Sequence, residues 1–215
     1  MQPDNSPFDA VVWDYDGTLV DTRSSDEAAV ADLVRSDPAS AAGVEIFWGS
    51  EGLPILERLE LAWPGRSHDV LPLFDRELRP RIYPGVRRTL TLLRDRGIGL
   101  AVVSSRRLGP LERGLRWCGL APYFETVVGL DSVLACKPDP EGLLLALRSL
   151  GVGPSRAVYV GDRDVDLEAG RRADIAAWHA VWSHAASQVA SSHPITLSHP
   201  GEVLARIDDS DLSAA

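Results

Sequence analysis

The chain has 215 residues, a formal net charge of −9 and 45% hydrophobic residues, a composition typical of a globular protein. The excess of acidic residues disfavours a nucleic-acid partner, because a phosphate backbone is also negative. No stretch approaches the roughly 20 apolar residues that span a bilayer, and residues 1–7 lack a leader pattern, so we expect a cytoplasmic protein, monomeric or homodimeric, without a membrane partner.

Short apolar runs that end at polar or glycine-containing turns predict buried strands. In chain order these strands are 8–13, 98–103, 125–128, 157–160, 176–182 and a short one at 195–197. Amphipathic segments predict helices at 86–96, 111–118, 140–150, 166–173 and 200–207. Strands that alternate with helices are typical of βαβ units, so the expected fold class is α/β, with a doubly wound parallel sheet.

Residues 23–83 interrupt this alternation and contain no convincing strand. Ser24 and Glu27 have the spacing of a capping box and predict the start of a helix. Further helices are expected from Pro54 and over 67–78. We therefore expect a small helical module inserted after the first strand, with a hinge at each end. The predicted division of the chain is a core of residues 1–22 and 84–215 and a helical module of residues 23–83.

Four polar clusters follow predicted strands, and the carboxyl ends of parallel strands form the edge at which open α/β sheets bind ligands. These clusters are residues 14–18, 104–105, 137–138 and 161–166. Converging carboxylates at Asp14, Asp16, Asp162 and Asp166 would repel one another unless a cation lay between them. Hard oxygen ligands without His or Cys suit Mg²⁺.

The basic residues of the chain are 21 Arg and a single Lys, Lys137. A lone lysine indicates a position that needs a compact ammonium and not a planar guanidinium, although survival by chance is the alternative. Together with the Ser104 hydroxyl and Mg²⁺, this ammonium suits a tetrahedral phosphoryl group.

With these motifs the chain resembles the haloacid dehalogenase-like hydrolase superfamily, in the phosphoglycolate phosphatase-like branch that carries a helical C1 cap. The first motif is Asp14-Tyr15-Asp16-Gly17-Thr18, and the later motifs are matched in order by Ser104, by Lys137, and by Asp162 with Asp166. The resemblance implies a core with strand order 5-4-1-2-3, on which the helical module is a cap. It also implies a Mg²⁺-dependent hydrolase that removes phosphate from a small phosphorylated metabolite through an aspartyl-phosphate.

The resemblance assigns a role to each matching residue. Asp14 is the nucleophile, and Asp16 is the general acid and then the general base. The implied Mg²⁺ ligands are Asp14, the backbone carbonyl of Asp16, and Asp162, supported by Asp166. The implied substrate contacts are Ser104 and Lys137 on the phosphoryl oxygens, with Ser105 and Gly52 as further substrate-binding residues.

Some residues leave alternatives open. The loop that contains Gly52 resembles a loop that covers the substrate, but it is equally an ordinary helix start. Arg163 stands where relatives carry a small Ser; we favour a surface pair with Asp164 over contact with the substrate. Cys136 is expected to be a small buried residue and not a nucleophile.

Two other functions compete with the phosphatase. A sugar-phosphate mutase of the same superfamily carries a cap-side His where this chain has Asp26. A non-catalytic phosphate-binding regulatory protein on this fold is the second, although all four motifs are complete.

Overall fold

The structure, a computed structural model, describes residues 7–50, 53–183 and 195–208. Residues 1–6 and Gly52 lie outside the described residues. None of the helices in this part of the chain combines the length and the apolar character that a bilayer span requires.

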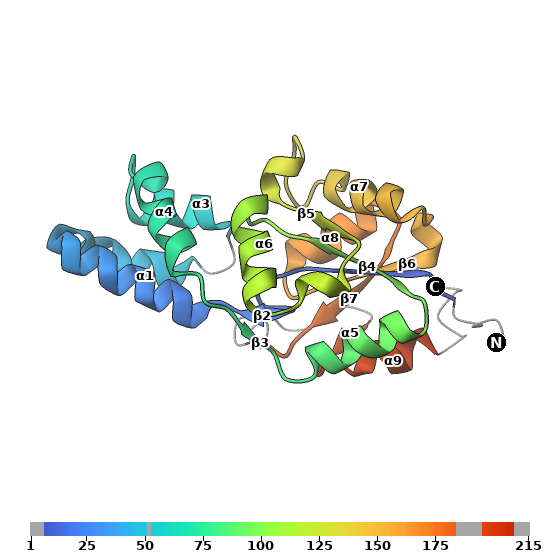
Figure 1. Cartoon of the computed structure of the whole chain (residues 1–215). Coiled ribbons are helices and arrows are strands. Elements are labelled where there is room, and N and C mark those ends of the chain that lie inside the picture. Colours follow the sequence, from blue (N-terminus) through green and yellow to red (C-terminus); the bar gives the residue numbers. More distant parts are fainter. Residues whose placement is uncertain (1–6, 51–52, 184–194, 209–215) are drawn as a thin grey trace.

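Six parallel strands form the central sheet, in the order β5-β4-β1-β6-β7-β8 (Figure 1). They are β1 (Ala10–Trp13), β4 (Gly99–Val103), β5 (Thr126–Val128), β6 (Ala157–Gly161), β7 (Ala176–Ala180) and β8 (Thr196–Leu197). Both faces of β1 are buried, which explains its uninterrupted apolar sequence. Counted in chain order within this sheet, the strands β1, β4, β5, β6 and β7 are numbers 1 to 5. Read from the β7 side, their order is 5-4-1-2-3, as expected, and β8 adds a sixth strand beside β7.

Helices cover both faces of the sheet (Figure 1). They are α5 (Val86–Asp95), α6 (Leu108–Trp117) and α9 (Glu202–Ile207) on one face, and α7 (Glu141–Leu150) and α8 (Asp164–Arg172) on the other. Successive residues of β1 point to opposite faces, so Val11 packs in the cluster of Leu90 while Val12 packs in that of Leu143. The doubly wound α/β fold that we expected is therefore present.

The inserted module is helical and has a core of its own. Its elements are α1 (Arg23–Ser36), a 3₁₀ segment (Pro38–Gly43), α2 (Val44–Gly49), α3 (Ile55–Ala62) and α4 (Ser67–Glu77). Phe47, Leu59 and Phe74 are buried together in this module. The predicted capping box is wrong, because α1 already begins at Arg23 and the preceding Thr22 directs its side chain to Asp16.

Both junctions of the module run through one short antiparallel ribbon, formed by β2 (Val20–Asp21) and β3 (Arg81–Ile82). We expected no strand at residues 81–82, so this is a correction. The pairing has only two residues on each side, too few to give a strand pattern in the sequence. The ribbon brings the entry and exit of the module together, beside the end of β1 (Figure 1).

Candidate active site

The polar clusters meet at the carboxyl edge of the sheet. Asp14 directly follows β1, Ser104 follows β4, and Asp162 follows β6. Lys137 arrives from the loop between β5 and α7. The order of the strands thus collects side chains that are more than 100 residues apart in the chain.

Lys137 lies at the centre of this cluster and is buried. Its Nζ donates hydrogen bonds to Asp14 Oδ1 at 2.5 Å, to Asp166 Oδ1 at 2.5 Å and to the Tyr159 hydroxyl at 3.0 Å. Burial opposes the charge of Lys137, but Asp14 and Asp166 raise its pKa above the usual value. Three acceptors thus surround one ammonium, which is a geometry that a compact cation satisfies.

Three carboxylates form a pocket of oxygen ligands. One oxygen each from Asp14, Asp162 and Asp166 lie within 4.8 Å of one another. Asp14 Oδ2 is buried and has no hydrogen-bond partner among the described residues. A buried acceptor without a partner, in a group of hard oxygen donors, fits Mg²⁺.

Without a metal ion, ionisation of all the buried carboxylates in this cluster is unfavourable. Burial raises the pKa of Asp14 to about 6, against the opposing charge of Lys137. Burial and the negative charges of Asp14 and Asp166 raise the pKa of Asp162 well above its usual range. A divalent cation among these carboxylates would offset both effects.

Two glycines allow this close approach. Gly17 has φ = +84°, and a Cβ there would lie 2.1 Å from Asp162 Oδ2. A Cβ on Gly161 would lie 2.4 Å from the Cβ of Asp166. Any side chain at either position would therefore displace a carboxylate of the cluster.

Asp162 is also held by Thr18 of the first motif and by Ser183 and His179, which the sequence did not indicate. Ser183 Oγ donates to Asp162 Oδ2 at 3.2 Å, and Thr18 Oγ1 lies 3.5 Å from Oδ1. His179 Nε2 donates to the Asp162 backbone carbonyl at 3.1 Å. These contacts orient the carboxylate toward the cluster.

The Asp166 carboxylate accepts three hydrogen bonds from neighbouring residues. Besides Lys137 it accepts hydrogen bonds from the Tyr159 hydroxyl at 3.0 Å and from the Arg163 backbone N–H at 3.0 Å. Burial opposes ionisation, but Lys137 and Arg163 hold the pKa of Asp166 below its usual value. Asp166 therefore positions Lys137, and Tyr159, missed in the sequence, was recognisable as the only hydroxyl-bearing side chain in β6.

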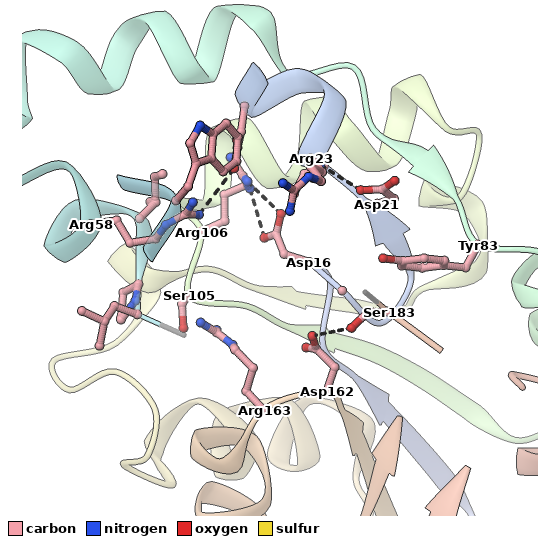
Figure 2. A pocket seen from close by; sticks show the side chains of 17 residues that line it. Asp16, Asp21, Arg23, Arg58, Tyr83, Ser105, Arg106, Asp162, Arg163 and Ser183 are labelled. Carbon is pink, nitrogen blue, oxygen red and sulfur yellow. Dashed lines mark hydrogen bonds and ion pairs between the residues drawn. The ribbon is translucent and has the colours of Figure 1, made fainter. Parts of the chain in front are cut away.

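The Asp16 carboxylate forms an ion pair with an arginine. Arg106 Nη2 donates to Asp16 Oδ1 at 2.7 Å and Arg106 Nε donates to Oδ2 at 3.2 Å (Figure 2). Burial opposes ionisation of Asp16, but Arg106 lowers its pKa below the usual value. Arg106 was not among the predicted site residues, although its place two residues after Ser104 was a usable signal.

The two serines after β4 have different surroundings. The Ser104 hydroxyl accepts a hydrogen bond from the Arg106 backbone N–H at 3.1 Å, so its own hydrogen is free to be donated. Ser105 Oγ is buried, lines the cavity and has no hydrogen-bond partner among the described residues. Both hydroxyls can therefore donate to an anion.

A cavity of about 130 Å³ lies between the sheet edge and the inserted module. Its polar lining includes Asp16, Asp162, Ser105 and Arg106 from the core and Asp26 and Arg58 from the module (Figure 2). Arg58 Nη1 lies 3.4 Å from Asp26 Oδ2, and its guanidinium lies 4.0 Å from the centre of the Phe47 ring. The module thus contributes charge as well as apolar surface to the cavity.

Arg163 also lines this cavity, and the expected surface pair with Asp164 is wrong. In Figure 2 its side chain extends into the cavity on the side of Ser105. Burial disfavours its charge, but Asp166, Asp14 and Asp162 raise its pKa above the usual value. The attraction of the carboxylate cluster explains why this side chain turns inward.

The expected burial of Cys136 is also wrong, because this residue is exposed. It directly precedes Lys137, and burial of that ammonium turns the neighbouring side chain outward. Gly52 lies outside the described residues, so its expected contact with substrate stays a prediction.

A doubly wound sheet with a helical insertion and a lysine held among aspartates at its carboxyl edge defines a class of α/β enzymes whose chemistry takes place at that edge. The chain belongs to the haloacid dehalogenase-like hydrolases, since the model of that family matches residues 8–174.

Individual relatives carry different names. The chain is 34% identical over 183 residues to a plasmid-encoded phosphoglycolate phosphatase of Cupriavidus necator, covering 79% of each chain. It is 31% identical over 198 residues to the pyrophosphatase PpaX of Bacillus velezensis, covering 86% of this chain and 88% of the relative. The crystal structure of CbbY from Rhodobacter sphaeroides in complex with phosphate superimposes with a TM-score of 0.73 and 22% identity, over 94% of this chain and 99% of the other. The family membership of the chain is therefore established, whereas the names of its relatives refer to different substrates.

Proposed function

We propose that the protein is a Mg²⁺-dependent phosphatase that releases phosphate from a small phosphorylated metabolite through an aspartyl-phosphate on Asp14. The environment of Asp14 carries this proposal. One of its oxygens accepts a hydrogen bond from Lys137, and the other is buried without a partner beside Asp162. Relatives named as phosphoglycolate phosphatase and pyrophosphatase support hydrolysis of a phosphate bond.

In the first step, an Asp14 carboxylate oxygen attacks phosphorus and the bond from phosphorus to the leaving oxygen breaks. Asp16 gives its proton to the leaving oxygen, which departs as an alcohol. Lys137 and the hydroxyls of Ser104 and Ser105 donate hydrogen bonds to the phosphoryl oxygens and stabilise the charge that they gain.

In the second step, water attacks the phosphorus of the aspartyl-phosphate and Asp16 takes its proton. The bond to Asp14 breaks, and phosphate and the free carboxylate are regenerated. Asp16 ends each cycle protonated, ready to act again as the acid.

Asp14, Asp162 and the backbone carbonyl of Asp16 would hold Mg²⁺, with Asp166 in support. When bound, the ion supplies charge neutralisation, which lets a phosphate anion approach the aspartates. The helical module acts as a cap over the cavity and excludes water from the reacting groups, moving on the ribbon of β2 and β3. The small cavity favours a metabolite of few atoms. The cytoplasmic location and the monomeric or homodimeric state stay predictions.

The side chain of Asp26 distinguishes the phosphatase from a mutase. It stands where the mutases carry a His, and Arg58 pairs with it at 3.4 Å. The chain therefore lacks the imidazole that the mutases carry at this position, and the carboxylate that replaces it is paired with a buried arginine. Hydrolysis is therefore the favoured reaction.

A panel of phosphorylated metabolites, assayed for phosphate release with Mg²⁺, tests the proposal, with Asp14→Asn as the control enzyme. We expect turnover of at least one small phosphate ester by the wild type and loss of roughly 10³-fold or more in Asp14→Asn. Hexose 1-phosphates in the panel, analysed for isomerisation, test the mutase. Binding of phosphate without any turnover would favour a regulatory protein and contradict the proposal.

A further inference from the structure

The contact between Arg106 and Asp16 is incompatible with the chemistry proposed for Asp16. The guanidinium of Arg106 donates to both carboxylate oxygens of Asp16, at 2.7 and 3.2 Å. The Arg106 side chain is only 8% exposed, while the Asp16 side chain is 30% exposed and faces the cavity. A carboxylate with both oxygens directed to one guanidinium is not directed to a leaving oxygen. The pair therefore describes a resting arrangement, and Arg106 must find another partner before Asp16 can react.

The surroundings of Arg106 indicate what that partner is. Its backbone is fixed, because its N–H donates to Ser104 Oγ at 3.1 Å and its carbonyl accepts from the Leu130 N–H at 2.9 Å. Its guanidinium lines the same cavity as Arg58 and Arg163 (Figure 2). A group that enters the cavity beside Asp16 thus meets a planar fork of donors that suits a carboxylate or a phosphate.

We infer that Arg106 is a specificity-determining residue: a second anionic group on the substrate, a carboxylate or a further phosphate, competes with Asp16 for the Arg106 guanidinium and so frees Asp16 for acid–base catalysis. This inference rests on the proposed function and names the class of substrate for the same site. A substrate without a second anionic group leaves Asp16 bound to Arg106 and reacts slowly, even when its phosphoryl group is correctly placed.

Charge explains why a neutral group does not suffice. Hydrogen bonds between a guanidinium and an anion are about twice as strong as those between neutral groups. A neutral hydroxyl cannot displace a carboxylate from its guanidinium, whereas an anion exchanges one ion pair for another at little cost. Substrates with a second anionic group should therefore have both a higher kcat and a lower KM than substrates without one.

Kinetics with two substrates of the same shape test this inference. Phosphoglycolate and ethyl phosphate differ mainly in a carboxylate that replaces a methyl group, and pyrophosphate provides a second anionic probe. We expect the wild type to favour phosphoglycolate or pyrophosphate over ethyl phosphate by about 10–100-fold in kcat/KM. Arg106→Gln should lose about that factor on the preferred substrate but hydrolyse ethyl phosphate faster than the wild type, because Asp16 is no longer bound by a guanidinium. Arg106→Lys should retain part of the preference.

The neighbouring Arg107 provides a matched control. It pairs with Asp75 outside the cavity, so Arg107→Gln should keep the wild-type preference. Thermal melts of all variants show whether they are folded. A purely structural role of Arg106 would lower activity on both substrates by the same factor.

Equilibrium binding gives a second test that needs no change at Arg106. Asp16→Asn removes the competing charge, so calorimetry with this slowly reacting variant should show tighter binding of phosphoglycolate by about tenfold, with binding of ethyl phosphate nearly unchanged. Equal effects on the two ligands would overturn the inference, as would a wild type without preference for the second anion. Failure to hydrolyse any phosphate ester would refute the proposed function itself, and the inference with it.

Discussion

Replacing Lys137 with arginine keeps the positive charge and should nevertheless inactivate the enzyme. Arginine is the cation that this chain uses at every other basic position. At this position, however, one Nζ serves three acceptors, at 2.5, 2.5 and 3.0 Å, in a site where the side chain is 4% exposed. A guanidinium is broader and carries its donors in one plane, so it cannot reach all three acceptors from the same point.

The magnitude follows from this geometry. The larger side chain must push Asp14, Asp166 or the Tyr159 ring aside, and a displacement of the reacting groups by about 1 Å costs roughly 10²-fold in rate. Overpacking of a buried site typically costs about 1–3 kcal/mol. We therefore expect kcat/KM of Lys137→Arg to fall by about 10²-fold and the melting temperature to fall by about 2–4 °C for each kcal/mol lost.

Steady-state kinetics on the best substrate of the panel, beside a thermal melt, measure both effects. Arg172→Lys is a matched control, because Arg172 pairs with Glu168 at the surface and should tolerate the exchange. Wild-type kinetics and an unchanged melt for Lys137→Arg would refute the reasoning and leave the lone lysine as an accident of composition.

The remaining predictions concern the metal, the cap and the cavity. Chelation by EDTA should abolish activity and Mg²⁺ should restore it, while Asp162→Ala should raise the Mg²⁺ requirement or eliminate turnover; full activity after exhaustive dialysis against chelator would contradict the metal site. Burial raises the pKa of Asp26 from 3.8 to about 6, so the folded protein binds this proton more tightly than the unfolded chain and loses stability as the pH rises from about 4 to 6. Asp26→Asn should remove this loss of stability. In thermal melts the variant should be more stable than the wild type by up to about 3 kcal/mol at pH 7.5 and as stable as the wild type near pH 4. A variant less stable than the wild type at pH 7.5 would contradict this prediction. Arg163→Gln should raise KM by about tenfold with a smaller effect on kcat, because the Arg163 side chain lines the cavity. An unchanged KM would show that Arg163 does not bind the substrate.

The sequence predicted the parts of the site that depend on strand order. Asp14, Ser104 and Asp162 each follow an apolar run, and such runs become parallel strands whose carboxyl ends share one edge. The parallel sheet and the helical insertion followed from the alternation of apolar runs with amphipathic segments and its interruption. The strand order, which is also confirmed, was implied by the family resemblance.

What the sequence did not predict depends on side-chain direction. Arg163 has the same neighbours in sequence whether it points to solvent or to the cavity, and only the assembled carboxylates draw it inward. Arg106 and Tyr159 act on partners far away in the chain, at Asp16 and Lys137, so their positions beside motif residues mark them as candidates but do not reveal these partners. The start of α6 at Leu108, three residues earlier than expected, is likewise fixed by a distant hydrogen bond, from its N–H to Asp131.

The most direct test of the account is to detect the covalent phosphate on Asp14. Asp16→Asn slows the hydrolysis of the aspartyl-phosphate, while a substrate with a good leaving group, such as p-nitrophenyl phosphate, needs no acid to form it. Acid quenching followed by borohydride reduction converts an aspartyl-phosphate to homoserine, which mass spectrometry locates in the peptide. We predict homoserine at position 14, dependent on Mg²⁺ and absent from a variant that also carries Asp14→Asn. Rapid phosphate release by the wild type, with no homoserine at position 14 or with the adduct on another residue, would contradict the account.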